Sequence, residues 1–200
     1  GRGVSAWAIA GRAITMPVMN LSAAFGAMIG AGGATLTSIK LGQQDTNSAQ
    51  KVLGNVFLLN VVLGVIFMFL GLLFLDEILY FFGASDNTIS YAKDFMQVIL
   101  IGNVITHLYL GLNSVMRASG HPTKAMKMTF LTVLINLVLA PLFIFVFGWG
   151  IRGAASATII AQTVAFAIIM KHFSNKDNLL HWKREIFTFD KRIIKGIISI

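Results

Sequence analysis

The chain has 200 residues, of which 56% are apolar and 12% are charged, and its formal net charge is +8. Soluble domains carry about 45–50% apolar and about 25% charged residues, so this chain has too little polar surface to cover a soluble core. The same apolar content excludes intrinsic disorder. The absence of cysteine excludes disulfides, thiolate nucleophiles and cysteine-based metal sites. These totals indicate an integral membrane protein.

Five runs without a charged residue are long enough to cross a bilayer, which takes about 20 mostly apolar residues in a helix. None of them alternates apolar and polar residues as a barrel strand does. The polar gaps between them are short, so we expect antiparallel neighbours in a bundle. We therefore predict an all-α transmembrane bundle over residues 1–170. In chain order, the predicted spans are residues 13–39, 52–75, 95–116, 128–151 and 153–170.

Residues 171–200 differ from the bundle in character. A polar stretch rich in Asn, Asp and Lys predicts a cytoplasmic linker, and residues 186–195 predict an amphipathic interfacial segment that leads into the next membrane helix. The alternative for this region is a solvated linker with a few apolar residues. The chain begins with Gly1 and ends inside a new apolar run, so we interpret it as an internal piece of a longer protein.

The distribution of Lys and Arg predicts the orientation, because cytoplasmic loops are enriched in both. Alternate gaps hold twelve basic residues on one side and four on the other, and the residues 76–94 gap is mainly acidic. The first span is therefore predicted to run from outside to inside. The positive charge is spread over several loops, which does not favour nucleic acid as a partner. The twelve are Lys40, Lys51, Arg117, Lys124, Lys127, Lys171, Lys176, Lys183, Arg184, Lys191, Arg192 and Lys195; the four are Arg2, Arg12, Lys93 and Arg152.

Uncharged polar side chains within the spans are the candidate functional residues, because such groups avoid lipid and face partners or a cavity. Thr129, Thr132 and Asn136 share one face of the fourth span at spacings i, i+3 and i+7, and Thr158 and Gln162 share a face of the fifth. Asn20 lies in the first span and Asn113 in the third. Such stripes indicate a hydrated interior. The alternative is interhelical hydrogen bonding, worth about 0.6 kcal/mol per bond in a membrane.

Other residues within the spans predict packing. Gly26 and Gly30 form a GxxxG pair that favours close helix contact. Pro17 predicts a kink or an irregular turn in the first span. His107 is a lone imidazole, for which a packed, hydrogen-bonded role is favoured over a proton relay.

The sequence lacks the motifs of an enzyme. The acidic residues lie in the predicted loops, and there is no HExxH, GxSxG, phosphate-binding loop or metal-ligand cluster. We therefore predict a protein that is not an enzyme and that has no cofactor.

Four stretches resemble multidrug and toxic compound extrusion (MATE) transporters, in matching order and spacing. Residues 113–122 resemble the N-x-x-x-R-A-x-G stretch that follows the fourth helix of that family. Residues 135–145 resemble its fifth-helix "iNiiLDPlfIF" motif, and residues 150–158 with Gln162 resemble its "GixGAAxAT…Q" motif. Residues 26–42 with Ala49 resemble its second helix and the following turn.

The resemblance implies helices two to six of the first lobe of a twelve-helix transporter, whose first helix and second lobe would be the partners of this chain. It implies antiport coupled to Na⁺ or H⁺, which exports amphipathic or cationic organic compounds by alternating access. It places Asn136, Thr158 and Asn113 in an ion-responsive polar network. The family's fifth-helix Asp falls at Ala140 in this sequence, which puts coupling through that position in doubt. The alternatives are a lipid or polysaccharide flippase of the same superfamily and a membrane module without transport of its own.

Overall fold

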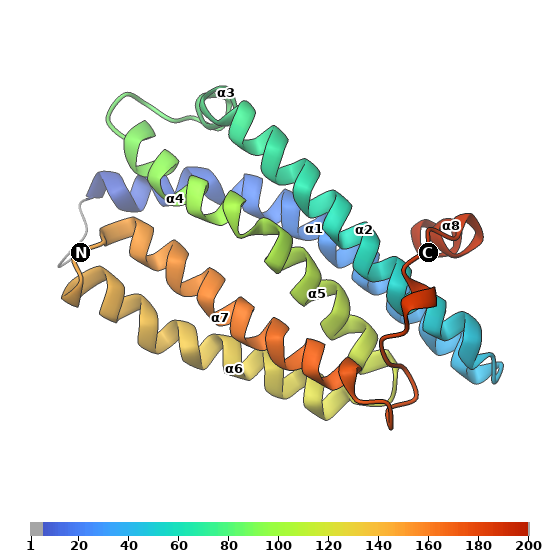
Figure 1. The fold of residues 1–200 in the computed structure, drawn as a ribbon. Coiled ribbons are helices and arrows are strands. Elements are labelled where there is room, and N and C mark those ends of the chain that lie inside the picture. Colours follow the sequence, from blue (N-terminus) through green and yellow to red (C-terminus); the bar gives the residue numbers. More distant parts are fainter. Residues whose placement is uncertain (1–5, 200) are drawn as a thin grey trace.

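The computed structural model describes residues 6–199, in which every regular element is helical. This confirms the predicted all-α class. The long helices lie roughly along one direction and connect through short turns, as Figure 1 shows. The elements are α1 (Ala6–Gly42), α2 (Thr46–Leu73), α3 (Leu75–Phe81), α4 (Ile89–Ile101), α5 (Asn103–Ala118), α6 (Pro122–Pro141), a π-helical segment (Leu142–Val146), α7 (Gly150–Ser174), a 3₁₀ turn (Arg184–Ile186) and α8 (Lys191–Ile198).

Four stretches of helix are each long and apolar enough to cross a membrane, and a fifth crossing arises if α4 and α5 together form one span. These two helices are bent by 52° at Gly102. The structure thus differs from the predicted span 95–116. The observed helix begins six residues earlier, at Ile89, and it is broken at Gly102. Ile159 of α7 lies against the backbone at Gly102, where any side chain would clash with it. A glycine therefore lets α7 approach closely at the break.

Other boundaries also differ from the predictions. α1 remains helical through Pro17, so the irregular turn expected there does not occur. The predicted span 128–151 instead runs from Pro122 to Val146. A turn follows in which Gly148 and Gly150 both have positive φ values, which favour glycine and end the preceding helix.

Helices α1, α2 and α5 form the closely packed part of the bundle. Leu53, Val56, Leu112 and Val115 are fully buried between them. Glycines permit this approach: a Cβ on Gly64 of α2 would lie 2.8 Å from the Cα of Val104. α6 is different, because it packs mainly along α7 at one side of the bundle and buries only Ala125 (Figure 1).

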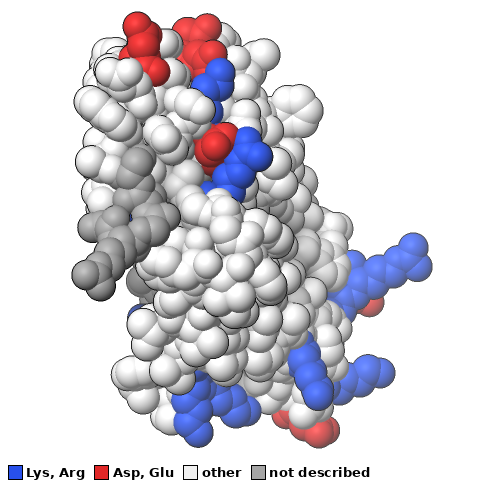
Figure 2. All heavy atoms as spheres, turned by 90° about the vertical axis from the view of Figure 1, so that its left-hand side faces the viewer, with Lys and Arg blue, Asp and Glu red and all other residues white. Residues whose placement is uncertain are grey.

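Charged side chains gather at the ends of the bundle. Figure 2 shows acidic and basic side chains together at the upper edge, a broad uncharged surface below them, and mostly basic side chains toward the lower edge. At the acidic end, Lys93 pairs with Asp76 at 2.7 Å and Arg152 pairs with Asp94. An uncharged surface between two charged ends is the pattern of a membrane-spanning protein.

The residues after α7 fold back onto the opposite end of the bundle. The backbone N–H of Trp182 donates to the carbonyl of Phe173 (2.8 Å), and that of Asp190 donates to Oδ1 of Asn55 on α2 (3.0 Å). α8 packs on α1 with Ile193 and Ile197 buried (Figure 1). The amphipathic segment is therefore a docked helix that begins at Lys191. Its continuation into a further membrane helix stays a prediction.

Candidate functional site

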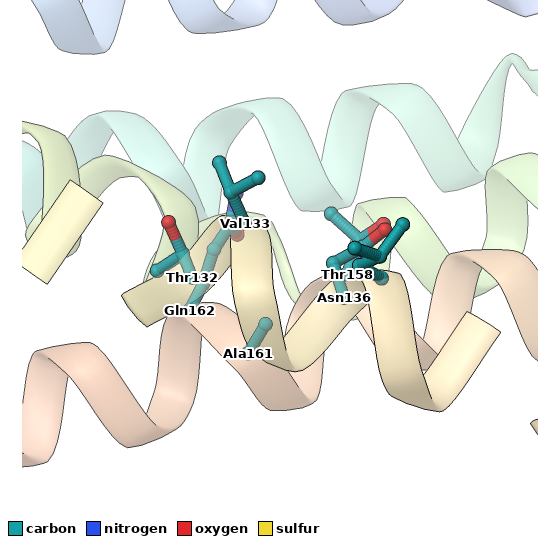
Figure 3. A pocket seen from close by; sticks show the side chains of 7 residues that line it. Thr132, Val133, Asn136, Thr158, Ala161 and Gln162 are labelled. Atoms are coloured by element: carbon teal, nitrogen blue, oxygen red, sulfur yellow. The ribbon is translucent and has the colours of Figure 1, made fainter. Parts of the chain in front are cut away.

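A polar groove of about 280 Å³ lies between α6 and α7. Its polar lining comes from the stripes that the sequence singles out, since Thr132 and Asn136 face it from α6, and Thr158 and Gln162 face it from α7 (Figure 3). The four-residue spacing within each pair places both members on one face of their helix, and the two faces lie opposite each other across the groove. None of the residues lining the groove is charged.

Asn136 and Thr158 are joined directly across the groove. Asn136 Nδ2 donates to Thr158 Oγ1 at 2.9 Å, and Thr158 Oγ1 donates in turn to the carbonyl of Ala154 at 3.1 Å. In Figure 3 the two side chains point toward one another from their helices. The threonine hydroxyl thus fixes the orientation of the amide. Both side chains remain half-buried, so a ligand in the groove can reach them.

Gln162 connects this groove to a second cavity, of about 230 Å³, on the inner side of α7. Its Oε1 accepts a hydrogen bond of 2.6 Å from Thr106 Oγ1 of α5. Thr158 and Gln162 line both spaces, and Asn20 of α1 lines only the inner one. The structure therefore brings four of the predicted site residues, Asn20, Asn136, Thr158 and Gln162, around one short segment of α7.

The other two predicted site residues lie elsewhere. Asn113 lines neither space: it is buried between α5 and α6, where its Nδ2 donates to Thr129 Oγ1 at 3.3 Å and its Oδ1 has no partner within the structure. Ala140 sits one turn beyond Asn136, immediately before Pro141 and the π-helical segment, and also lines neither space. Its methyl group supplies no ion ligand.

Sequence reasoning missed one member of the interior, Ser22 of α1. Its hydroxyl lies 2.9 Å from Asn103 Oδ1 and 3.0 Å from His107 Nε2, and all three residues are buried. The ring of His107 also packs 5.9 Å from that of Phe67, so its contacts are those of a packed, hydrogen-bonded residue. A signal was available, because Ser22 lies four residues before Gly26 and eight before Gly30, on the same face of α1.

Within residues 6–199, no group of three or more His, Asp or Glu side chains could hold a metal ion. Amide and hydroxyl oxygens are therefore the cation-binding groups that the groove offers. Such neutral oxygens suit a weakly held monovalent ion or the hydrogen-bonding groups of an organic molecule.

Comparisons with known proteins agree on one family. The MatE family profile matches residues 2–142. The multidrug export protein MepA of Staphylococcus haemolyticus is 30% identical over 187 residues, which are 94% of this chain and 41% of that protein. An outward-facing multidrug resistance MATE family transporter of the MOP superfamily superposes with a TM-score of 0.93 at 26% identity, over 100% of this chain and 44% of that one. An inward-facing transporter of the same family superposes with a TM-score of 0.92 at 26% identity, over 96% of this chain and 44% of that one. The chain thus spans less than half the length of these proteins.

Proposed function

The chain belongs to the MatE family of multi-pass membrane transporters, and from this premise we propose that it forms part of a secondary active transporter that exports amphipathic or cationic organic compounds. The observation that carries the proposal is the uncharged polar groove between α6 and α7. An apolar wall with a few convergent amide and hydroxyl groups is the lining that small organic ligands prefer. Because such a lining binds a ligand without charged contacts, it also keeps the barrier to ligand release low, which transport requires.

Transport is proposed for the whole protein and not for these 200 residues alone. The chain covers 41% of the Staphylococcus haemolyticus protein that is named for multidrug export. We propose that a further helix and a second lobe complete the substrate cavity, and that the whole assembly lies in a bacterial inner membrane. Alternating access then moves the two lobes relative to one another around a fixed site. The existence of inward- and outward-facing relatives supports this mechanism.

We propose antiport against Na⁺ or H⁺ as the driving reaction, with no further cofactor. The Asn136–Thr158 pair is a switchable element, because its 2.9 Å hydrogen bond can be exchanged for contacts to an ion or a substrate. Ala140 provides no carboxylate beside it, so a proton-accepting group has to come from elsewhere in the protein. Introducing A140D tests this, since a carboxylate there should alter the pH or Na⁺ dependence of export.

A flippase for lipids or polysaccharides is the second candidate, and the uncharged lining of the groove disfavours it. A phosphorylated lipid headgroup or an acidic sugar calls for Lys or Arg in the cavity. None of the residues that line the two spaces beside α7 is basic. A membrane module without transport is the third candidate, and only a flux measurement separates it from a transporter.

The decisive experiment uses the full-length protein in a bacterial host that lacks its own efflux pumps. We expect this host to export a cationic dye, and we expect the export to stop when the Na⁺ or H⁺ gradient is removed. N136A should reduce the rate, whereas N47A should leave it unchanged, because Asn47 is exposed in the first turn of α2, far from the groove in sequence and fold. No ion-dependent export by the wild-type protein contradicts the proposal, and equal rates for both variants contradict the role of Asn136.

A further inference from the structure

A basic pocket of about 380 Å³ lies at the end of the bundle that is predicted to be cytoplasmic. Three helices converge there: Lys40 lies in the last turn of α1, Lys51 near the start of α2, and Arg192 in the first turn of α8. Ser48 adds a hydroxyl, and Leu36 and Ile193 form an apolar floor. We use the term "basic pocket" for these residues together with Asp190, which completes the lining.

The two nearby carboxylates are already engaged. Asp190 caps α8, because its Oδ1 accepts hydrogen bonds from the backbone N–H groups of Arg192 (2.9 Å) and Ile193 (3.4 Å). Asp45 caps α2 through Ser48 N–H (3.0 Å), and its other oxygen lies 3.9 Å from Lys40 Nζ. Among residues 6–199, neither Lys51 nor Arg192 has an ion-pair partner. The basic pocket thus sets three cations against the carboxylates of Asp190 and Asp45 and keeps a net positive charge.

The helix that carries Arg192, α8, is held in place by close backbone packing. α8 lies so near α1 that a side chain on Gly32 would collide with the carbonyl of Ile197, and the chain before α8 meets α2 in the same way at Gly54 and Ile186. The Asn55–Asp190 hydrogen bond fixes the start of α8. The backbone positions that carry the three cations are therefore fixed relative to one another, which lowers the ordering cost of binding one anion between them.

Exposed apolar side chains adjoin the basic pocket. Ile39 precedes Lys40 on α1, Phe189 precedes Asp190, and Ile198 ends α8; 45%, 57% and 56% of their surfaces are exposed. An amphipathic helix with basic and exposed apolar residues lies in the interface of a membrane. A charged group recognised here would therefore have hydrocarbon next to it.

We propose that the basic pocket binds the phosphate of an anionic phospholipid headgroup from the cytoplasmic leaflet. Lys, Arg and Ser are the side chains that bind phosphate through charge-assisted hydrogen bonds, and basic pockets between membrane helices on the cytoplasmic side take such headgroups. The bound lipid ties α8 to the ends of α1 and α2. The proposal rests on the membrane setting and is independent of the compound transported.

The test uses the full-length protein, purified and reconstituted in nanodiscs of phosphatidylcholine with increasing phosphatidylglycerol, with retained lipid measured by native mass spectrometry. The triple variant K40Q/K51Q/R192Q should lose about tenfold or more in apparent affinity for phosphatidylglycerol, since it removes the three cationic hydrogen-bond donors that line the pocket. The matched control K124Q/K127Q/K176Q removes three exposed basic residues from the same end of the protein and should retain the lipid.

A conservative variant, K40R/K51R/R192K, should restore binding, which separates a headgroup site from a folding defect. A parallel titration with inorganic phosphate distinguishes the source: displacement of phosphatidylglycerol by millimolar phosphate would show a site for free phosphate and contradict the lipid proposal. Equal retention by the test triple and the control triple would also overturn it. Dye export by the control variant reports the proposed transport separately, so the failure of one proposal does not imply the failure of the other.

Discussion

Two regions of the bundle place polar side chains among apolar helices and use them differently. Between α1 and α5, Ser22, Asn103 and His107 are buried and bonded to one another. Between α6 and α7, Asn136 and Thr158 are bonded but half-buried beside a groove. Glycines explain the contrast, because α1 carries several at its contacts, whereas α6 contains none. Close backbone approach lets Ser22 bond across the contact between α1 and α5, and Ser22 and Asn103 also line the inner cavity. Wider spacing between α6 and α7 leaves Asn136 and Thr158 accessible from the groove.

The largest expected effect comes from filling a glycine contact in the packed region. The Cβ that G64V introduces would lie 2.8 Å from the Cα of Val104, which is backbone and cannot move aside cheaply. Overpacking of this kind costs about 1–3 kcal/mol. Thermal unfolding of the detergent-solubilised protein should show a clear fall in Tm.

The matched control for this prediction is G42V. Gly42 ends α1 with no atom near the position of its missing Cβ, so the same substitution should leave Tm almost unchanged. An unchanged Tm for G64V would show that α2 and α5 do not depend on close packing, and would remove the basis of the contrast between the two regions.

The next effect should appear in transport and not in stability. T158V keeps the shape of Thr158 but removes the hydroxyl that accepts the hydrogen bond from Asn136. Loss of one membrane hydrogen bond costs about 0.6 kcal/mol, so Tm should change little. If the pair binds substrate or ion, export should fall about tenfold, which corresponds to about 1.4 kcal/mol. T158S keeps the hydroxyl and should retain export; a large fall in Tm for T158V would instead make the pair a structural contact.

Single-cysteine labelling tests whether the groove holds water, and these 200 residues contain no cysteine that would add to the background. Val133 lines the groove and is 59% exposed, whereas Val56 is fully buried in the packed region. V133C should react with a membrane-impermeant maleimide at least about tenfold faster than V56C, because the reagent attacks hydrated thiolates. Equal, slow reaction at both positions would mean that lipid or protein fills the groove.

The sequence predicts the spans and the α6–α7 stripe because both follow from local patterns. Charge-free runs locate the helices, and the spacing of Thr132 and Asn136 suffices to place them on one face. The break at Gly102 could not be predicted, since that stretch is apolar and lacks proline, and its close neighbour Ile159 lies on another helix. The surroundings of Asn113 also depend on the fold, which shows that its partner is Thr129 and that it lines neither space.

The smallest effect concerns the turns that join the helices of each region. In the packed region, Asp45 caps α2; hydrogen bonds from Ser48 hold its pKa below the usual value of 3.8. A lowered pKa in the folded state contributes stability that is present above the pKa of the unfolded chain and is lost as pH falls through the folded pKa. The turn before α7 has no side-chain cap and relies on glycines with positive φ instead.

D45A should therefore lower Tm slightly at pH 7, and the difference from the wild type should shrink as the pH falls below about 4 and through the lowered pKa of the folded carboxyl. D45N should lie closer to the wild type at pH 7, because asparagine also caps helices. Tm measured across pH 3–7 for the three proteins checks this. A gap between D45A and the wild type that does not change with pH would mean that the carboxylate's charge adds nothing to the cap, and that the turn of the packed region is held by geometry alone, as the turn before α7 is.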